Sequence, residues 1–187
     1  VGFPNAGKSS FLRSVSRAMP KVAPYQFTTL RPHIGMIEFD DFHQISVADL
    51  PGLVEGAHEN VGLGFEFLRH IERTSVLAYV VDVSRSDALY SFEQLRHELQ
   101  EYNEDLLNRP SIIIANKSDE ENYDTNLPEF LEGVEDILEE ESKERLKKGR
   151  TKKERKALPV FSISAATGEG VSNVVHGLRN LIEMGKM

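Results

Sequence analysis

The stretch GFPNAGKS at residues 2–9 fits the phosphate-loop pattern GxxxxGK[ST], in which a glycine-containing turn opens into a helix. Its glycines let the backbone curl so that successive N–H groups face the phosphates of a nucleotide. The charge of Lys8 suits the β- and γ-phosphates, and the hydroxyl of Ser9 suits Mg²⁺. A turn with an exposed lysine is the alternative for this motif alone. The residues expected to contact phosphate are Gly2, Phe3, Pro4, Asn5, Ala6, Gly7, Lys8, Ser9 and Ser10.

A second motif, NKSD at residues 116–119, adds specificity for the base. The carboxylate of Asp119 can accept hydrogen bonds from both the ring N–H and the exocyclic amine of guanine, a pair of donors that adenine lacks. A site built to pair both donors rejects the analogue, because its own polar groups would stay unpaired. The two motifs together predict GTP or GDP as the ligand. The residues expected around the base are Asn116, Lys117, Ser118 and Asp119, with Ser164, Ala165 and Ala166 offering a backbone N–H to the guanine O6.

Two further segments are typical of a γ-phosphate sensor with Mg²⁺ as the cofactor. Phe27, Thr28 and Thr29 lie between the first expected helix and a hairpin, where the Thr29 hydroxyl can reach the metal. Asp49 ends an expected strand and would hold Mg²⁺ through water. An ordinary polar turn and a strand-ending turn are the alternatives. The segment DLPG supplies Asp49, Leu50, Pro51 and Gly52, with the N–H of Gly52 against the γ-phosphate.

Hydrophobic periodicity predicts an α/β domain. Helices are expected over residues 10–19, 65–73, 89–107 and 171–184, and strands buried on both faces over 76–82, 111–115 and 159–163. Residues 34–39 and 44–48 flank two aspartates and predict an antiparallel hairpin. Because strands alternate with helices, most of the sheet should be parallel, with crossover helices. The strand that feeds the phosphate loop is expected to precede Val1, so we expect an N-terminally truncated fragment.

Composition indicates one soluble globular domain: 187 residues, 40% hydrophobic and 28% charged. No apolar run approaches the roughly 20 residues of a membrane span. The absence of cysteine excludes disulfides and thiolate metal sites and fits a reducing compartment. A net charge of −8 argues against nonspecific nucleic-acid binding by the whole surface. Acidic residues 132–141 precede a basic run at 143–156, which either contacts RNA phosphates or is solvated and paired with the acidic stretch.

The motifs together resemble the G domain of the Obg family of GTPases. The phrases that carry the resemblance are GFPNAGKS at 2–9, YQFTTL at 25–30, ADLPGLVEGAH at 48–58, GLG at 62–64 and FLRHIERT at 67–74. The last phrase differs from the corresponding segment of the related DRG proteins. The carboxylate of Asp119 is absent from the related YchF proteins, which bind ATP. The resemblance covers the chain except for a charged insertion at about 120–158.

This resemblance implies that residues 1–187 are an Obg-type G domain with a Ras-like fold. That fold has a mostly parallel six-stranded sheet with one antiparallel hairpin strand and helices on both faces. The resemblance also implies a preceding glycine-rich domain and a role in assembling the large ribosomal subunit. A translation-associated GTPase of the DRG type is an alternative. The variable segment and the phrase FHQISVAD at 42–49 favour the mitochondrial matrix, with the bacterial cytoplasm as the alternative.

Ras-like GTPases orient the attacking water with a glutamine at the position that Leu53 occupies here. We therefore expect slow intrinsic turnover, on the order of 10⁻³ s⁻¹ or below, with stimulation by a partner or by K⁺. Asn5 either coordinates K⁺ or serves loop geometry, since asparagine tolerates left-handed backbone angles. The catalytic set is thus Lys8, Thr29, Gly52 and Asn5, and the metal set is Ser9, Thr29 and Asp49. A solvent-facing or partner-facing position without direct chemistry is the stronger hypothesis for the following residues: Arg31, His58, Glu59, Arg69, His70, Glu72 and Arg73.

The leading functional hypothesis is a monomeric GTPase that acts as a timer. GTP orders the loops, the protein binds a ribosomal precursor, and hydrolysis releases it. The rival is a GTP-dependent binding module whose hydrolysis is incidental, which Leu53 keeps open. A Ras-type signalling protein with a lipid anchor is disfavoured, because no lipidation signal ends the sequence at Met187.

Overall fold

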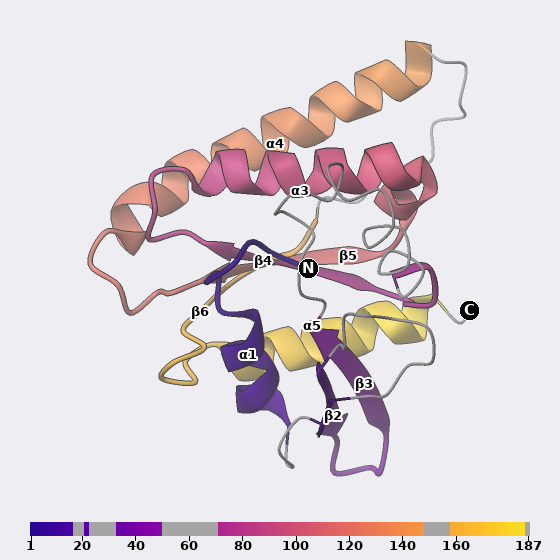
Figure 1. Cartoon of the computed structure of the whole chain (residues 1–187), viewed down its shortest axis with the longest axis vertical. Coiled ribbons are helices and arrows are strands. Elements are labelled where there is room, and N and C mark those ends of the chain that lie inside the picture. Colours follow the sequence, from indigo (N-terminus) through magenta and orange to yellow (C-terminus); the bar gives the residue numbers. More distant parts are fainter. Residues whose placement is uncertain (17–20, 23–32, 50–70, 148–157, 186–187) are drawn as a thin grey trace.

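The computed structural model describes residues 1–16, 21–22, 33–49, 71–147 and 158–185, without the side chains of 21, 22 and 145. Helices and strands alternate through most of these residues (Figure 1). In chain order they are α1 (Lys8–Val15), β1 (Lys21–Val22), β2 (His33–Glu38), β3 (Gln44–Asp49), β4 (Leu77–Asp82), α3 (Ala88–Tyr102), the 3₁₀ helix η1 (Glu104–Asn108), β5 (Ser111–Asn116), α4 (Tyr123–Lys147), β6 (Val160–Ile163) and α5 (Val171–Met184). The α/β class with a parallel sheet and an antiparallel hairpin is confirmed.

The parallel sheet has the strand order β4-β5-β6. Its register pairs Asp82 with Asn116, and Asn116 with Ile163, so the carboxyl ends of all three strands finish in one row. Ligands of open α/β sheets bind outside the carboxyl ends of the strands. The loops after β5 and β6, which carry both expected base-binding segments, therefore start side by side.

The hairpin β2–β3 belongs to a second, antiparallel sheet of order β1-β2-β3. The described strands thus pair as two three-stranded sheets rather than as one sheet of six. A cavity of about 450 Å³ lies between them, lined by all six residues of β3 and by several residues of β4. On the β4 side Val1 adds a pairing, since its N–H donates to the Ala78 carbonyl and its carbonyl accepts from the Val80 N–H, both at 2.8 Å.

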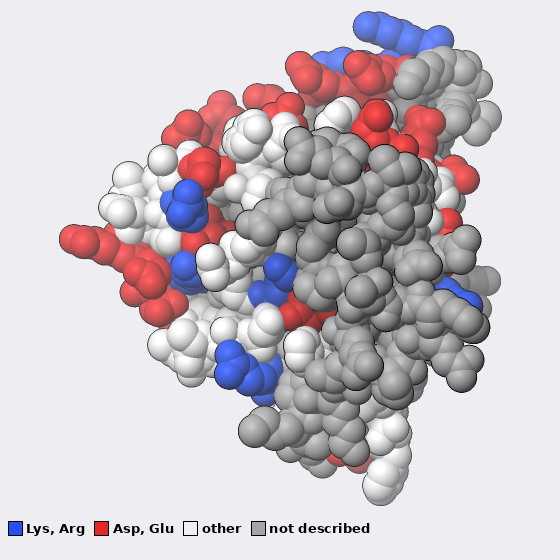
Figure 2. Space-filling view, in the orientation of Figure 1, with Lys and Arg blue, Asp and Glu red and all other residues white. Residues whose placement is uncertain are grey.

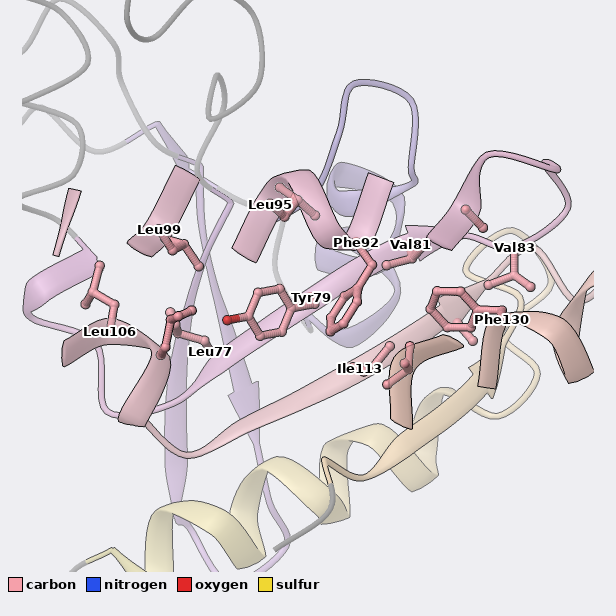
Figure 3. Close-up of a cluster of buried hydrophobic side chains, with 14 of the residues drawn as sticks. Leu77, Tyr79, Val81, Val83, Phe92, Leu95, Leu99, Leu106, Ile113 and Phe130 are labelled. Atoms are coloured by element: carbon pink, nitrogen blue, oxygen red, sulfur yellow. The ribbon is translucent and has the colours of Figure 1, made fainter. Parts of the chain in front are cut away.

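Helices cover both faces of the parallel sheet, with α3 and α4 on one side and α1 and α5 on the other (Figure 1). Under α3 and α4 lies an aromatic core in which Tyr79, Phe92 and Phe130 meet in edge-to-face contacts, with ring centroids 5.4 and 6.2 Å apart (Figure 3). All six residues of β5 are buried, as expected for a central parallel strand. In β6 only Ile163 is buried, because this strand is the edge of the sheet; the expectation of burial on both faces is wrong there.

Two helices differ from the sequence prediction. The helix expected over 89–107 divides at Asn103, whose extended backbone ends α3 and whose side chain accepts from the Asp105 N–H to start η1. The charged segment expected as an insertion contains a helix that we did not predict, the 25-residue α4. Phe130 and Val134 of α4 belong to the same buried cluster as α3 residues, so a narrow apolar stripe seats this acidic helix.

One ion pair is buried between α3 and α4. The Arg96 guanidinium is 3% exposed and binds Glu141 through Nε at 2.7 Å and Nη2 at 2.5 Å. It also lies over the rings of Tyr79 and Phe92, at 5.6 Å from each centroid. Burial is the largest single influence on the pKa of Arg96 and lowers it, but the hydrogen bonds and electrostatic interactions with Glu141 and Tyr79 together outweigh it, so the net shift is upward and the charge is kept. This pair fixes the C-terminal half of α4 against the sheet layer.

Replacing Glu141 by Ala should lower the free energy of unfolding by about 3 kcal/mol, because it leaves the Arg96 charge buried without its partner. The matched control is Glu139→Ala on the same helix, which removes an exposed pair with Lys143 and should change stability by less than about 0.5 kcal/mol. Urea denaturation measures both. Equal losses in the two variants would contradict the importance of the buried pair.

Candidate functional site

The phosphate loop has the backbone expected of an anion cradle. Gly7 takes a left-handed conformation (φ 100°) as the N-cap of α1, and Asn5 takes another (φ 63°). Lys8 folds back across the loop and donates from Nζ to the carbonyls of Gly2 and Phe3, at 2.7 and 2.9 Å. Burial lowers the pKa of Lys8, while the Asp49 carboxylate acts in the opposite direction. The lysine is therefore held at the mouth of the loop by neutral carbonyl oxygens, with its charge available to a phosphate.

The expected metal region joins α1 to the end of β3. The Ser9 hydroxyl donates to Oδ2 of Asp49 at 2.6 Å. Oδ1 of the same carboxylate is buried and has no hydrogen-bond partner among the described residues. A hydroxyl beside a carboxylate with a spare buried oxygen suits Mg²⁺, which is bound through one or two protein oxygens, phosphates and several waters. Among the described residues, no group of three or more His, Cys, Asp or Glu side chains is placed to hold a metal ion.

Asn116 joins the phosphate loop to the loop after β6. Its side-chain amide is 2% exposed and donates from Nδ2 to the Ala6 carbonyl at 2.7 Å, while Oδ1 accepts from the Ala165 N–H at 2.9 Å. The same amide leaves no room for a side chain at position 7, since a Cβ on Gly7 would lie 2.1 Å from Nδ2 of Asn116. The structure therefore brings together three of the predicted segments, at residues 2–9, 116–119 and 164–166.

Asp119, the residue expected to bind the guanine base, is exposed. The Ser118 N–H donates to the Ile163 carbonyl at 3.0 Å, and the Ser118 hydroxyl is buried without a partner among the described residues. Within the third segment, the N–H of Ser164 is used by Glu169 and that of Ala165 by Asn116. Ala166 is exposed and is thus the residue of this segment whose N–H suits the guanine O6.

Asp82 is a residue of the site that the sequence analysis missed. It ends β4, and its Oδ2 pairs with Nζ of Lys117 at 2.7 Å, while Oδ1 accepts from the hydroxyl and the N–H of Ser84. Lys117 has a left-handed backbone (φ 72°), so the pair fixes a side chain that starts from a strained position. The available signal was an aspartate at the end of a buried strand parallel to the one that leads into NKSD.

Several predicted residues lie outside the described part of the chain, and their expected roles stay predictions. They are Phe27, Thr28, Thr29, Arg31, Leu50, Pro51, Gly52, Leu53, His58, Glu59, Arg69 and His70. Glu72 and Arg73 are described and exposed, as their assignment to a solvent or partner face required. Of the basic run, Lys143 and Lys147 are exposed on α4, and Lys143 pairs with Glu139 of the acidic stretch. The same acidic stretch lines the edge of the molecule formed by α4 (Figure 2).

Comparison with known proteins agrees with this geometry. The model of a family described as "50S ribosome-binding GTPase" matches residues 1–117. The chain is 46% identical to a probable GTP-binding protein OBGM, mitochondrial, of Oryza sativa subsp. japonica and 44% identical to a GTPase Obg of Geobacillus kaustophilus, each over 98% of the chain. It belongs to the Obg family of GTPases. The chain spans about a third of these relatives, 32% and 38% of their lengths.

The fold is also that of solved G domains. A putative nucleolar GTP-binding protein 1 from Plasmodium falciparum superposes with a TM-score of 0.70 over 99% of the chain and 84% of its own, at 22% identity. Era of Aquifex aeolicus superposes with a TM-score of 0.62 over 95% of the chain and 53% of its own, at 21% identity. At these identities the likeness shows the Ras-like P-loop fold, which the Obg resemblance implied. None of the helices described in the structure has the length and apolar character of a bilayer span.

Substituting Gly7 by Ala should weaken GTP and GDP binding at least tenfold and lower unfolding free energy by about 3 kcal/mol. The added methyl group both strains a left-handed backbone and displaces the Asn116 amide, which leaves buried polar groups unpaired. Gly168→Ala is the matched control, since Gly168 has a similar φ of 89° but nothing within 4 Å of the new Cβ. Isothermal titration and urea denaturation distinguish the two effects. A Gly168 variant as defective as the Gly7 variant would show that backbone strain alone is responsible.

Asp82→Asn should reduce affinity for GTP and for GDP by a similar factor, about tenfold, because Lys117 loses the charge that positions it beside the base. Asp87→Asn is the control, since Asp87 holds an exposed pair with Arg85 in the turn that follows β4. Fluorescent-nucleotide titration measures the two affinities. Unequal losses for GTP and GDP would place Asp82 with the phosphates instead.

Proposed function

We propose that this domain binds GTP with Mg²⁺ and hydrolyses it slowly to GDP and phosphate as a switch in assembly of the large ribosomal subunit. The observation that carries the proposal is the double hydrogen bond of Asn116 to Ala6 and Ala165. This bond holds a phosphate cradle and a base pocket in one rigid unit, which is what binding of a whole nucleotide requires. The family assignment supports GTP as that nucleotide.

The chemistry follows from positioning and from neutralisation of charge. Lys8 would exchange its bonds to the Gly2 and Phe3 carbonyls for the β- and γ-phosphates. Ser9 and Asp49 would hold the metal, directly and through water, and bound Mg²⁺ would neutralise charge on the phosphate oxygens. Thr29 as a further metal ligand and Gly52 as a γ-phosphate donor complete the proposed site. Leu53 gives no hydrogen bond to an attacking water, so turnover should depend on a stimulus.

Two stimuli are proposed. The large ribosomal subunit is the first, supported by the name of the family whose model matches the chain. K⁺ is the second, with Asn5 as its ligand in the phosphate loop. The left-handed backbone of Asn5 is the geometry that the alternative, a purely conformational role, requires. The two roles of Asn5 differ in their consequences, since only K⁺ coordination makes GTP turnover depend on the cation.

The relatives are consistent with two compartments, the mitochondrial matrix and the bacterial cytoplasm. A rice mitochondrial relative and bacterial relatives match the chain at similar identity. We propose the mitochondrial matrix, with the bacterial cytoplasm as the alternative. The second functional candidate is a GTP-dependent binding module in which hydrolysis is incidental, and Leu53 is the feature that favours it.

GTP turnover should be measured in KCl and in NaCl, each with and without purified large ribosomal subunits. We expect subunits to raise turnover at least tenfold, and K⁺ to raise it further in the wild type but not in an Asn5→Ala variant. Asn5→Gly keeps the left-handed backbone accessible and serves as the control for loop geometry. Tight GTP binding with negligible turnover in all four conditions would reject the switch and support the binding module.

A further inference from the structure

The turn between β2 and β3 places a phenylalanine where the backbone suits glycine or asparagine. The Phe42 N–H donates to the Phe39 carbonyl at 3.0 Å, and the Phe39 N–H donates to the His43 carbonyl at 2.9 Å, which closes the turn. Phe42 itself has a φ of 64°. In short hairpin loops this left-handed position is usually taken by glycine or asparagine, and a bulky residue there is an outlier.

Burial does not compensate for this strain. The Phe42 side chain is 94% exposed, more than any other large apolar side chain among the described residues; the next is Tyr90 at 60%. An exposed apolar residue alone is ordinary. Phe42 combines exposure with a left-handed backbone, so the described fold gains neither packing nor turn geometry from the ring. Strain of this kind is typical of functional sites, and it points to a contact of the ring beyond the described residues.

The turn is held rigidly on α5. Arg179 donates to both carboxylate oxygens of Asp41, through Nη1 at 3.2 Å and through Nη2, and its Nε donates to Glu183 at 2.8 Å. The guanidinium also lies 4.8 Å from the centroid of the Phe39 ring. The hydrogen bonds from Arg179 lower the pKa of Asp41, so this carboxylate stays charged at neutral pH. An anchor that is already ordered loses little entropy when it binds.

The surroundings of Phe42 decide the class of partner. Three carboxylates, those of Glu38, Asp40 and Asp41, lie in or beside the turn against the single guanidinium of Arg179, so the turn is net acidic, and an acidic surface disfavours the phosphates of RNA. A protein pocket that is apolar at its centre and basic at its rim fits both the ring and its neighbours. Aromatic side chains buried at the centre of an interface supply most of its binding energy.

We propose that Phe42 is the anchor of a protein-docking site, and that it inserts into a basic-rimmed apolar pocket on a protein of the large ribosomal subunit. This inference rests on the ribosomal partner proposed above. The β2–β3 hairpin lies on the side of the molecule opposite α4, next to α5 (Figure 1). Its strand β3 ends at Asp49, the proposed metal-binding carboxylate, so the docking site and the phosphate site share one hairpin.

Binding of the GTP-loaded chain to purified large ribosomal subunits should be measured by sedimentation for the wild type, Phe42→Gly, Phe42→Tyr and Tyr90→Ser. Phe42→Gly should bind subunits at least tenfold more weakly, while its GTP affinity stays unchanged and its stability is unchanged or higher, because glycine relieves the left-handed strain. Phe42→Tyr should keep most of the binding. Tyr90→Ser, at an exposed aromatic on α3, should bind like the wild type.

The same proteins should be tested against protein-free ribosomal RNA from those subunits. Equal binding of wild type and Phe42→Gly to intact subunits would overturn the inference and leave the ribosomal partner in place. Binding to the bare RNA that is lost in Phe42→Gly would also overturn it, because the ring would then stack on a base. A wild type that does not bind subunits would reject the ribosomal partner itself.

Discussion

One buried amide joins the parts of the site. The phosphate loop precedes α1, whereas the base-recognition loops follow β5 and β6, more than 100 residues later in the sequence. Asn116 spans this separation with one hydrogen bond to each side. Because the amide is excluded from water, losing either partner would leave a buried polar group unpaired, at a cost of about 1–3 kcal/mol. The relative position of the phosphate loop and the loop after β6 thus depends on both hydrogen bonds of Asn116.

The parallel register makes this arrangement possible. Asp82, Asn116 and Ile163 end their strands in one row, so the Asn116 side chain at the end of the middle strand reaches the phosphate loop at Ala6 and the loop after β6 at Ala165. Asp82 restrains Lys117 from one flank, and the Ile163 carbonyl receives the Ser118 N–H on the other. The apolar strands that set this register are buried by helices on both faces, so the site inherits its rigidity from the core.

Much of this was predictable from sequence because the signals are local. The phosphate loop, NKSD and the three strands of the parallel sheet are short patterns with a direct structural consequence. Contacts that depend on register were not predictable: Asp82 is remote in sequence from Lys117 and belongs to no motif. The helix α4 was missed for another reason. Its acidic face dominates the composition of its segment, and the few apolar side chains that seat it against α3 become meaningful only once α3 is in place. Ser162 is exposed because of its place at a sheet edge, which periodicity does not reveal.

The closed hydrogen bonding on the base side has a consequence for how the protein distinguishes its two nucleotides. Lys117, Asn116 and the loop after β6 are held by bonds within the protein, and in the proposed site they would face the base, which GTP and GDP share. A ligand shifts a conformational equilibrium only by its difference in affinity for the two states. This half of the proposed site would therefore contribute equally to the affinity for GTP and for GDP and would not favour either nucleotide. Discrimination between the nucleotides falls to the end of the cradle near Ser9 and Asp49, where a spare carboxylate oxygen has no bond of its own in the described protein.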